Sequence, residues 1–324
     1  MSMTDTANKK TRKQRKEEEA GGFVRNKFNS ISPVSNAIIT TVLSIISLLM
    51  IIPMVLVIII SFSSNASIAN VGFSFVPEEW SLEGYQYLFK MGEQVLDSYI
   101  ITIFYTVVGT VMSLTVMSLF AYVIAQKNFP ARGMFTWMLF FTMLFSGGLV
   151  PSYILNVRYL NMYDTVWVFL LPSLVSAYNV IILRTFIQTT IPDTLFEAAK
   201  IDGAGHWRIF AQIVLPLFKA GLATIGLFNI VGRWNDWFTG MLYIDNAKLV
   251  PIQTLLQKIQ SQLDFLKNNS AITGTPEGIQ MMRTLPTQSL RMACVVIIVL
   301  PILCAYPFFQ RYFVSGLTIG SVKG

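Results

Sequence analysis

The segment TTIPDTLFEAAKIDGAGHWRIFAQIVLPLFK, residues 189–219, combines good helix formers with an Asp-Gly pair and two prolines. This pattern predicts two short helices joined by a turn. Thr190 is expected to cap the first helix. Gly203 is expected to end it, because glycine adopts the left-handed backbone conformation at no steric cost. The second helix is predicted over about residues 206–214, stopping before Pro216, which lacks a backbone N–H.

The residues of this segment allow two interpretations. The paired alanines Ala198 and Ala199 permit close approach of another protein surface, and Glu197 adds a charge, so the first helix suits a docking element. The alternative is an amphipathic helix that lies on the bilayer without binding a partner. The residues by themselves leave both interpretations open.

The sequence around this segment is typical of an integral membrane protein. Of the 324 residues, 53% are hydrophobic and only 13% are charged, whereas soluble domains carry about 25% charged residues. A membrane-spanning helix needs about 20 mostly apolar residues, and six segments meet this requirement, which predicts one transmembrane domain with loops. The predicted spans cover residues 37–62, 98–125, 134–153, 166–187, 220–243 and 290–313.

Lysines and arginines predict the side of the membrane on which each loop lies, because cytoplasmic loops carry an excess of them. With the N-terminus inside, sixteen of the 24 basic residues fall in inner segments and six in outer segments. A basic cluster can bind nucleic acid, but beside a hydrophobic protein it favours a role in orientation, and no nucleic-acid partner is expected. Residues 1–36 and 314–324 are therefore predicted cytoplasmic tails, and residues 63–97 and 244–289 outer loops.

The segment 189–219 also resembles the signature loop of permeases of binding-protein-dependent ABC importers. The matching pattern is Glu-Ala-Ala, two residues, Asp-Gly-Ala and a later I-x-L-P sequence. The resemblance implies an all-α integral membrane fold, the type I importer transmembrane domain of six helices with both termini cytoplasmic. It also implies that this loop couples the chain to an ATPase. One departure is Ala220, where many relatives have proline. The matching residues are Glu197, Ala198, Ala199, Asp202, Gly203, Ala204, Ile213, Leu215 and Pro216.

The resemblance further implies the partners of the chain. A second homologous permease, a dimer of ATPase subunits, an extracytoplasmic sugar-binding protein and membrane lipid are expected. The chain contains no G-x-x-x-x-G-K-S/T phosphate loop, so ATP and Mg are expected to be used by the ATPase and no cofactor to bind this chain directly.

Shorter patterns narrow the resemblance to the maltose-type carbohydrate permeases. This branch implies an oligosaccharide substrate, including chains derived from pectin or alginate. An importer for another solute, such as a peptide or a lipid, is the alternative within the same class. The matching stretches are Pro77–Phe89, Ala121–Tyr122, Phe129–Arg132, Pro151–Tyr153, Asp164–Thr165, Leu171–Pro172, Gln310–Val314 and Ile319–Gly324.

Catalytic chemistry is not expected in this chain. His206 is the only histidine, so a histidine-based metal cluster or a Ser-His-Asp triad cannot form, and no catalytic or metal-binding residue is assigned. An integral-membrane enzyme would need clustered acids or histidines at a membrane face. An ion-driven secondary transporter would favour acids inside the spans, where only Asp236 qualifies. These two classes are the alternatives to a non-catalytic transport subunit.

Polar and aromatic residues inside the predicted spans are candidates for a substrate pathway, because a charge at the centre of a bilayer costs about 2.5–3.5 kcal/mol. A sugar ring has one apolar face and a rim of hydroxyls, which aromatic and planar polar side chains can bind together. The alternative is an Arg233–Asp236 ion pair with tryptophans at the membrane interface. The candidate residues are Tyr178, Asn179, Asn229, Arg233, Trp234, Asn235, Asp236 and Trp237.

Overall fold

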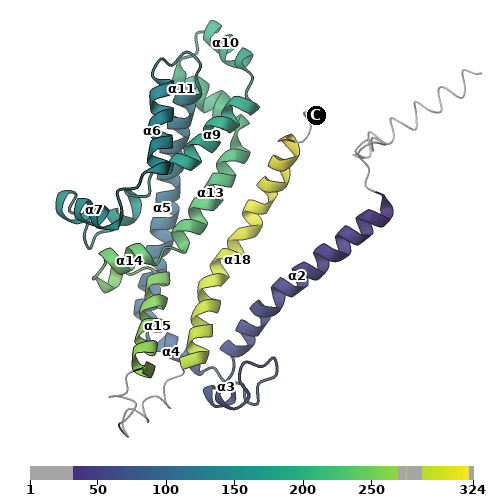
Figure 1. Cartoon of the computed structure of the whole chain (residues 1–324), viewed down its shortest axis with the longest axis vertical. Coiled ribbons are helices and arrows are strands. Elements are labelled where there is room, and N and C mark those ends of the chain that lie inside the picture. Colours follow the sequence, from purple (N-terminus) through teal and green to yellow (C-terminus); the bar gives the residue numbers. More distant parts are fainter. Residues whose placement is uncertain (1–31, 269–274, 276–286, 321–324) are drawn as a thin grey trace, which may run out of the picture. The chain divides into compact units, whose positions relative to one another are not determined.

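The structure is a computed structural model, which describes residues 32–268, 275 and 287–320 (Figure 1). These residues form helices, with one isolated antiparallel bridge and no longer strand. The prediction of an all-α protein is therefore confirmed for this part of the chain. The predicted cytoplasmic tails fall outside it over residues 1–31 and 321–324, as does part of the last predicted outer loop.

The chain divides into two compact units, residues 1–56 and 57–324. Helix α2, Pro33–Ser61, supplies the described part of the first unit. It has 29 residues, and at about 1.5 Å per residue it is long enough to cross a bilayer. The helix continues through Pro53, as proline-containing membrane helices often do.

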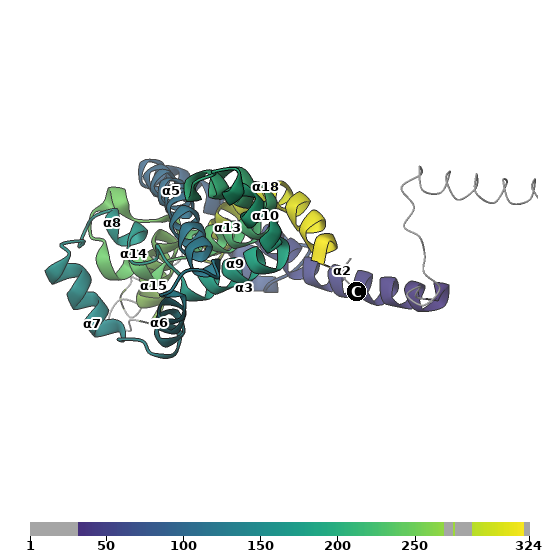
Figure 2. The same ribbon diagram turned by 90° about the horizontal axis from the view of Figure 1, so that it is seen from above.

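The second unit is built around helix α5. Helices α9 and α13 lie beside α5 and beside each other, as Figure 2 shows from the α10 end. Along α5, α10 lies at one end and α15 at the other (Figure 1). The elements of this unit are α3 (Asn65–Val71), α4 (Glu83–Lys90), α5 (Gly92–Ala125), α6 (Arg132–Leu144), α7 (Leu149–Ile154), η1 (Leu155–Tyr159), α8 (Trp167–Leu170), α9 (Ala177–Thr190), α10 (Asp193–Ile201), α11 (His206–Ile209), η2 (Phe210–Val214), α12 (Leu215–Leu217), α13 (Lys219–Trp234), α14 (Phe238–Tyr243), η3 (Ala247–Leu249), α15 (Ile252–Asn268) and α18 (Thr287–Gly320).

Length and composition identify two described helices, α2 and α5, that can each cross a membrane. The number rises to four if each of two bent helix pairs counts as one span. One pair joins α6 to α7 and η1 with a bend of 114°, and the other joins α11 and α12 to α13 with a bend of 79°. The full set of six spans therefore stays a prediction.

Three predicted spans are interrupted in the structure, each for a local reason. The third breaks between α6 and α7, where Gly148 has a φ of +87° that favours glycine. The fourth breaks between α8 and α9 around Pro172, which cannot donate a helical hydrogen bond. The fifth breaks after Trp234, and Asp236 accepts a hydrogen bond of 3.0 Å from the Thr239 N–H at the start of α14.

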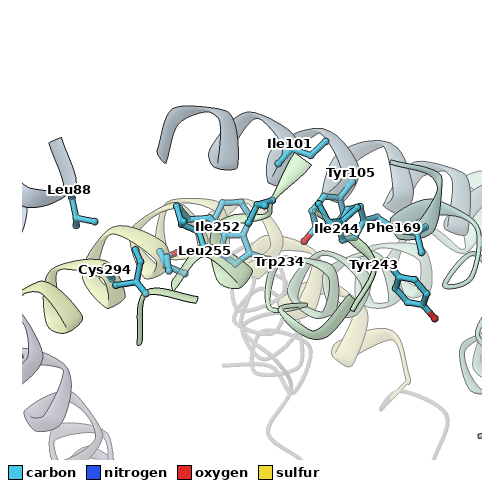
Figure 3. Packing of buried hydrophobic residues seen from close by; sticks show 14 of the residues in the cluster. Leu88, Ile101, Tyr105, Phe169, Trp234, Tyr243, Ile244, Ile252, Leu255 and Cys294 are labelled. Atoms are coloured by element: carbon cyan, nitrogen blue, oxygen red, sulfur yellow. Dashed lines mark hydrogen bonds between the residues drawn. The ribbon is translucent and has the colours of Figure 1, made fainter. Parts of the chain in front are cut away.

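Two clusters of buried hydrophobic residues lie at the two ends of α5. The α15 cluster includes Tyr105 of α5, Phe169 of α8, Trp234 of α13 and Leu255 of α15 (Figure 3). The α10 cluster, at the other end, packs α5, α9, α10 and α13 together. Its most buried members include Met117, Val180, Leu183, Val214, Phe218 and Ile225.

Candidate functional site

Helix α10 begins later than the sequence suggests. Thr190 is the last residue of α9, and Pro192 occupies the N-cap of α10 without a side-chain capping bond. The prediction that Thr190 caps this helix is wrong. The residue before a proline is driven into an extended conformation, and Ile191 adopts it, so the helix starts one step after the proline.

The predicted glycine corner after α10 is confirmed. Gly203 has a φ of +75°, in the left-handed region that favours glycine. The Ala204 N–H donates to the Ala199 carbonyl at 2.9 Å, and the Asp202 N–H donates to the Ala198 carbonyl at 3.0 Å. A Cβ at Gly203 would meet nothing within 4 Å, so backbone conformation, not space, requires glycine here.

The second helix of the segment extends past its predicted end. The chain is helical through α11, the π-helical turn η2 and α12, which contains Pro216. The wide turn lets the Leu215 N–H donate to the Phe210 carbonyl, and Pro216 follows as a helical residue that donates no backbone bond. The prediction of a stop before Pro216 is therefore wrong, and the bend follows at Phe218.

The face of α10 that packs inward differs sharply from the face that does not. Ala199 is buried in the α10 cluster, whereas Glu197, Ala198, Asp202 and Gly203 are exposed. Ala199 is the buried residue of this helix, and the partly buried Phe196 packs against the same cluster. The exposed residues form an accessible surface, and Ala199 holds the helix against the α10 cluster.

Within this segment, His206 at the start of α11 lies next to Tyr122 of α5. Its Nδ1 lies 3.4 Å from the Tyr122 hydroxyl of α5, and the two rings meet edge to face at 6.4 Å. Among the residues that the structure describes, no group of three or more His, Cys, Asp or Glu residues could hold a metal ion.

Arg233, near the end of α13, is buried in the second unit. Its Nη1 donates to the Phe169 carbonyl at 2.6 Å, and its Nη2 donates to the Ser113 hydroxyl at 2.8 Å and to the Ser173 carbonyl at 3.1 Å. The guanidinium therefore satisfies carbonyls that the break between α8 and α9 leaves without helical donors. Within the described ranges, Arg233 forms no ion pair with Asp236.

The other pathway candidates divide into buried and accessible side chains. Trp234 is buried and donates to the Ile298 carbonyl at 3.2 Å. Tyr178, Asn235 and Trp237 are exposed, and the Asn235 side-chain oxygen accepts a bond from Gln253 at 3.1 Å. Asn179, Asn229 and Asp236 are half-buried.

A second corner joins the loop before α8 to the loop after α14. Asp164 has a φ of +57°, and its Oδ1 accepts the backbone N–H of Asp245 at 3.1 Å and of Asn246 at 2.8 Å. Tyr163 donates to the Asp245 carboxylate at 2.6 Å, and this bond raises the pKa of Tyr163 to about 12. Sequence reasoning noted Asp164 only as a match to a pattern.

Comparison with known proteins places the chain in a family. It is 36% identical over 264 residues to the polygalacturonan/rhamnogalacturonan transport system permease protein YtcP of Bacillus subtilis, which covers 82% of this chain and 89% of YtcP. It is 38% identical over 265 residues to the Bacillus subtilis protein LplC, which covers 82% of this chain and 86% of LplC. The chain belongs to the carbohydrate permeases of ABC transporters.

The fold of this carbohydrate permease is also that of a solved transporter subunit. A chain in the crystal structure of a bacterial ABC transporter involved in the import of the acidic polysaccharide alginate is 29% identical, with a TM-score of 0.73. The match covers 89% of this chain and all of that one. No family model matches. As a member of this family, the chain is a multi-pass protein of the cell membrane.

Two exposed apolar side chains of this carbohydrate permease escaped sequence reasoning. Ile201 is 85% exposed and Trp207 is 73% exposed, on either side of the Gly203 corner in the sequence. Large apolar side chains on an exposed surface are typical of binding sites. The available signal was their position, because both lie in the segment 189–219, outside every predicted span.

Proposed function

We propose that this chain is the permease subunit of an ATP-driven importer that translocates an oligosaccharide delivered by an extracytoplasmic binding protein. The observation that carries the proposal is the surface on α10, where Glu197 and Ala198 are exposed while Ala199 anchors the helix. The relatives support the substrate class, because one is named for polygalacturonan and rhamnogalacturonan and another for alginate. We therefore propose an oligosaccharide derived from an acidic polysaccharide.

The segment 189–219 is proposed to dock onto the ATPase. The exposed side chains of Glu197, Asp202, Ile201 and Trp207 supply two charges and two large apolar contacts. An ATPase surface with a matching apolar cleft would bury these contacts, and the buried side of α10 would transmit its movement to α5 and α9.

In the proposed cycle, this chain pairs with a second permease above two ATPase subunits. ATP and Mg bind to the ATPase subunits, whose closure moves the docked segments together. The permease pair then changes between two conformations, one favoured by ATP and one by its absence, with the loaded binding protein acting from the other side. The chain itself is a non-catalytic subunit and binds no cofactor.

Replacing Gly203 with valine tests the coupling role. A β-branched residue in the left-handed conformation costs about 1–2 kcal/mol, so the corner should rearrange and sugar-stimulated ATPase activity of the reconstituted complex should fall about tenfold. Gly203→Asn should retain activity, because asparagine tolerates this conformation.

Gly205→Val is the matched control for this experiment. Gly205 has an ordinary φ of −72° and open space around its Cβ position, so valine fits there and stimulation should persist. Normal stimulation in Gly203→Val would contradict the coupling assignment, provided that membrane insertion is equal in all variants.

We also propose that the accessible aromatic and polar side chains near the break in span five line the sugar pathway. Trp237→Ala should lower sugar uptake by roughly threefold to tenfold, the magnitude of a lost aromatic contact, while sugar-stimulated ATPase activity persists. Trp137→Ala, at another exposed tryptophan on α6, is the control. Equal uptake in the two variants would refute the pathway assignment of Trp237.

A further inference from the structure

A polar cleft lies beside α10, at the ends of α5 and α9 and the start of α6. Its volume is about 420 Å³, within the usual range of small-molecule sites. Three cationic side chains line it, those of Lys127, Arg132 and Lys200, together with the carboxylates of Asp193 and Glu197. The cleft thus joins the proposed docking helix to the ends of three spans.

The cations of the cleft are only partly neutralised by its acids. Lys127 forms an ion pair with Asp193, and both side chains are more than half exposed, so this bond is weak and can open. In the described part of the chain, Arg132, Lys200 and Glu197 form no ion pair. Arg132 therefore contributes a guanidinium without an ion-pair partner to the lining of the cleft.

A fourth cation, Arg184, lies one turn before Gln188, a residue that lines the cleft from α9. The Arg184 Nε is buried and has no hydrogen-bond partner. Arg184 stands three and four residues before Ile187 and Gln188 on α9, so it lies on the helix face that lines the cleft. A buried N–H without an acceptor costs free energy, and neither Arg132 nor Arg184 forms an ion pair with a carboxylate in the described residues.

We propose that this cleft binds a phosphate group, held by Arg132 and Arg184. The guanidinium fork matches the oxygens of a phosphate and binds it with charge-assisted hydrogen bonds. The proposal rests on the proposed function for one point, the cytoplasmic location of the cleft. There, the headgroup of an anionic phospholipid of the inner leaflet and a soluble phosphate compound are the two sources of this group.

A bound phosphate would act on the coupling segment. The cation Lys200 belongs to α10, whereas the cations Arg132 and Arg184 belong to α6 and α9. An anion shared between these cations would hold α10 against the ends of the spans. Binding of the phosphate in the cleft would therefore strengthen the coupling between movement of α10 and movement of the spans.

Lipid binding to the whole transporter complex tests the site. The delipidated complex is titrated with phosphatidylglycerol or phosphatidylcholine, and bound lipid is counted by mass spectrometry of the intact complex. Wild type should prefer phosphatidylglycerol. Arg132→Gln and Arg184→Gln should each weaken that binding about tenfold, the loss of one charge-assisted bond, and Arg132→Lys should retain part of it. Arg208→Gln, a charge loss on α11 outside the cleft lining, should have no effect.

Asp193→Asn gives a result that misfolding cannot imitate. It frees Lys127 and removes a negative charge from the cleft, so phosphatidylglycerol should bind more tightly than in wild type. Competition by inorganic phosphate or glycerol phosphate, with the same sensitivity to Arg132→Gln, would also support the site and assign a soluble source.

The proposal would be overturned if wild type bound both lipids equally and ignored inorganic phosphate, or if Arg132→Gln and Arg184→Gln bound like wild type. These measurements need neither sugar nor ATP. Failure of the phosphate site is therefore distinguishable from failure of the proposed transport function, which is measured by stimulated ATPase activity and uptake.

Discussion

At the scale of single residues, the buried position of the Arg233 guanidinium requires glycine at position 109. A Cβ at Gly109 would lie 2.5 Å from Nη1 and 2.7 Å from Cζ of Arg233, so only glycine leaves room for the guanidinium against α5. The guanidinium in turn bonds the carbonyls of Phe169 and Ser173 at the break in span four. The buried charge is tolerated because Nη1 and Nη2 both find acceptors, although the buried Nε has none.

Gly109→Ala should therefore destabilise the protein by about 1–3 kcal/mol, the usual cost of overpacking a core. The check is the midpoint of thermal unfolding of the solubilised complex. Gly232→Ala is the control, because a Cβ at Gly232 meets nothing within 4 Å and alanine favours a helix.

The clash between a Cβ at position 109 and the Arg233 guanidinium predicts that substitutions at these two positions have non-additive effects on stability. In an Arg233→Ala background the space is vacated, so the additional cost of Gly109→Ala should largely disappear. An equal cost in both backgrounds would show that Gly109 is needed for a different reason.

At the scale of elements, hydrogen bonds join two loops that are about 80 residues apart in the sequence. The loop before α8 and the loop after α14 are joined by Asp164, which accepts two backbone N–H groups, and by the bond from Tyr163 to Asp245. These bonds supply acceptors for the backbone N–H groups of Asp245 and Asn246, which follow the end of α14.

The Tyr163–Asp245 bond predicts a pH dependence. Because the folded-state pKa of Tyr163 is raised to about 12 from an unfolded value of about 10, the bond contributes stability that is complete below about pH 10. That stability is lost as the pH rises through about 12.

The difference in unfolding midpoint between wild type and Tyr163→Phe should accordingly be constant up to about pH 9 and shrink above it. Tyr159→Phe, at a neighbouring exposed tyrosine, should show no such change. A difference for Tyr163→Phe that stays constant to the highest pH would contradict the assignment.

Some elements were predictable because their causes are local. The corner at Gly203 follows from one glycine after an Asp, and the long helices α2 and α5 follow from runs of apolar residues. The breaks in spans three to five were missed, because a hydropathy window averages over Gly148 or Pro172. The cap at Thr190 was mispredicted because the proline two residues later moved the helix start.

At the scale of the whole molecule, the sequence by itself determined the helical membrane class, and the resemblance of segment 189–219 indicated the family. Both depend on local patterns, since hydropathy and turn chemistry act over a few neighbouring residues. Relatives with 36% and 38% identity then assigned the chain to the carbohydrate permeases.

Only the tertiary structure decided what the polar residues of the spans and loops do. Arg233 bonds Ser113, which is 120 residues away, and Lys127 pairs with Asp193, which is 66 residues away. Neither contact leaves a local trace in the sequence, because packing of separate helices brings the partners together. The sequence marked Arg233 as unusual inside a membrane span, and the fold showed which carbonyls it serves.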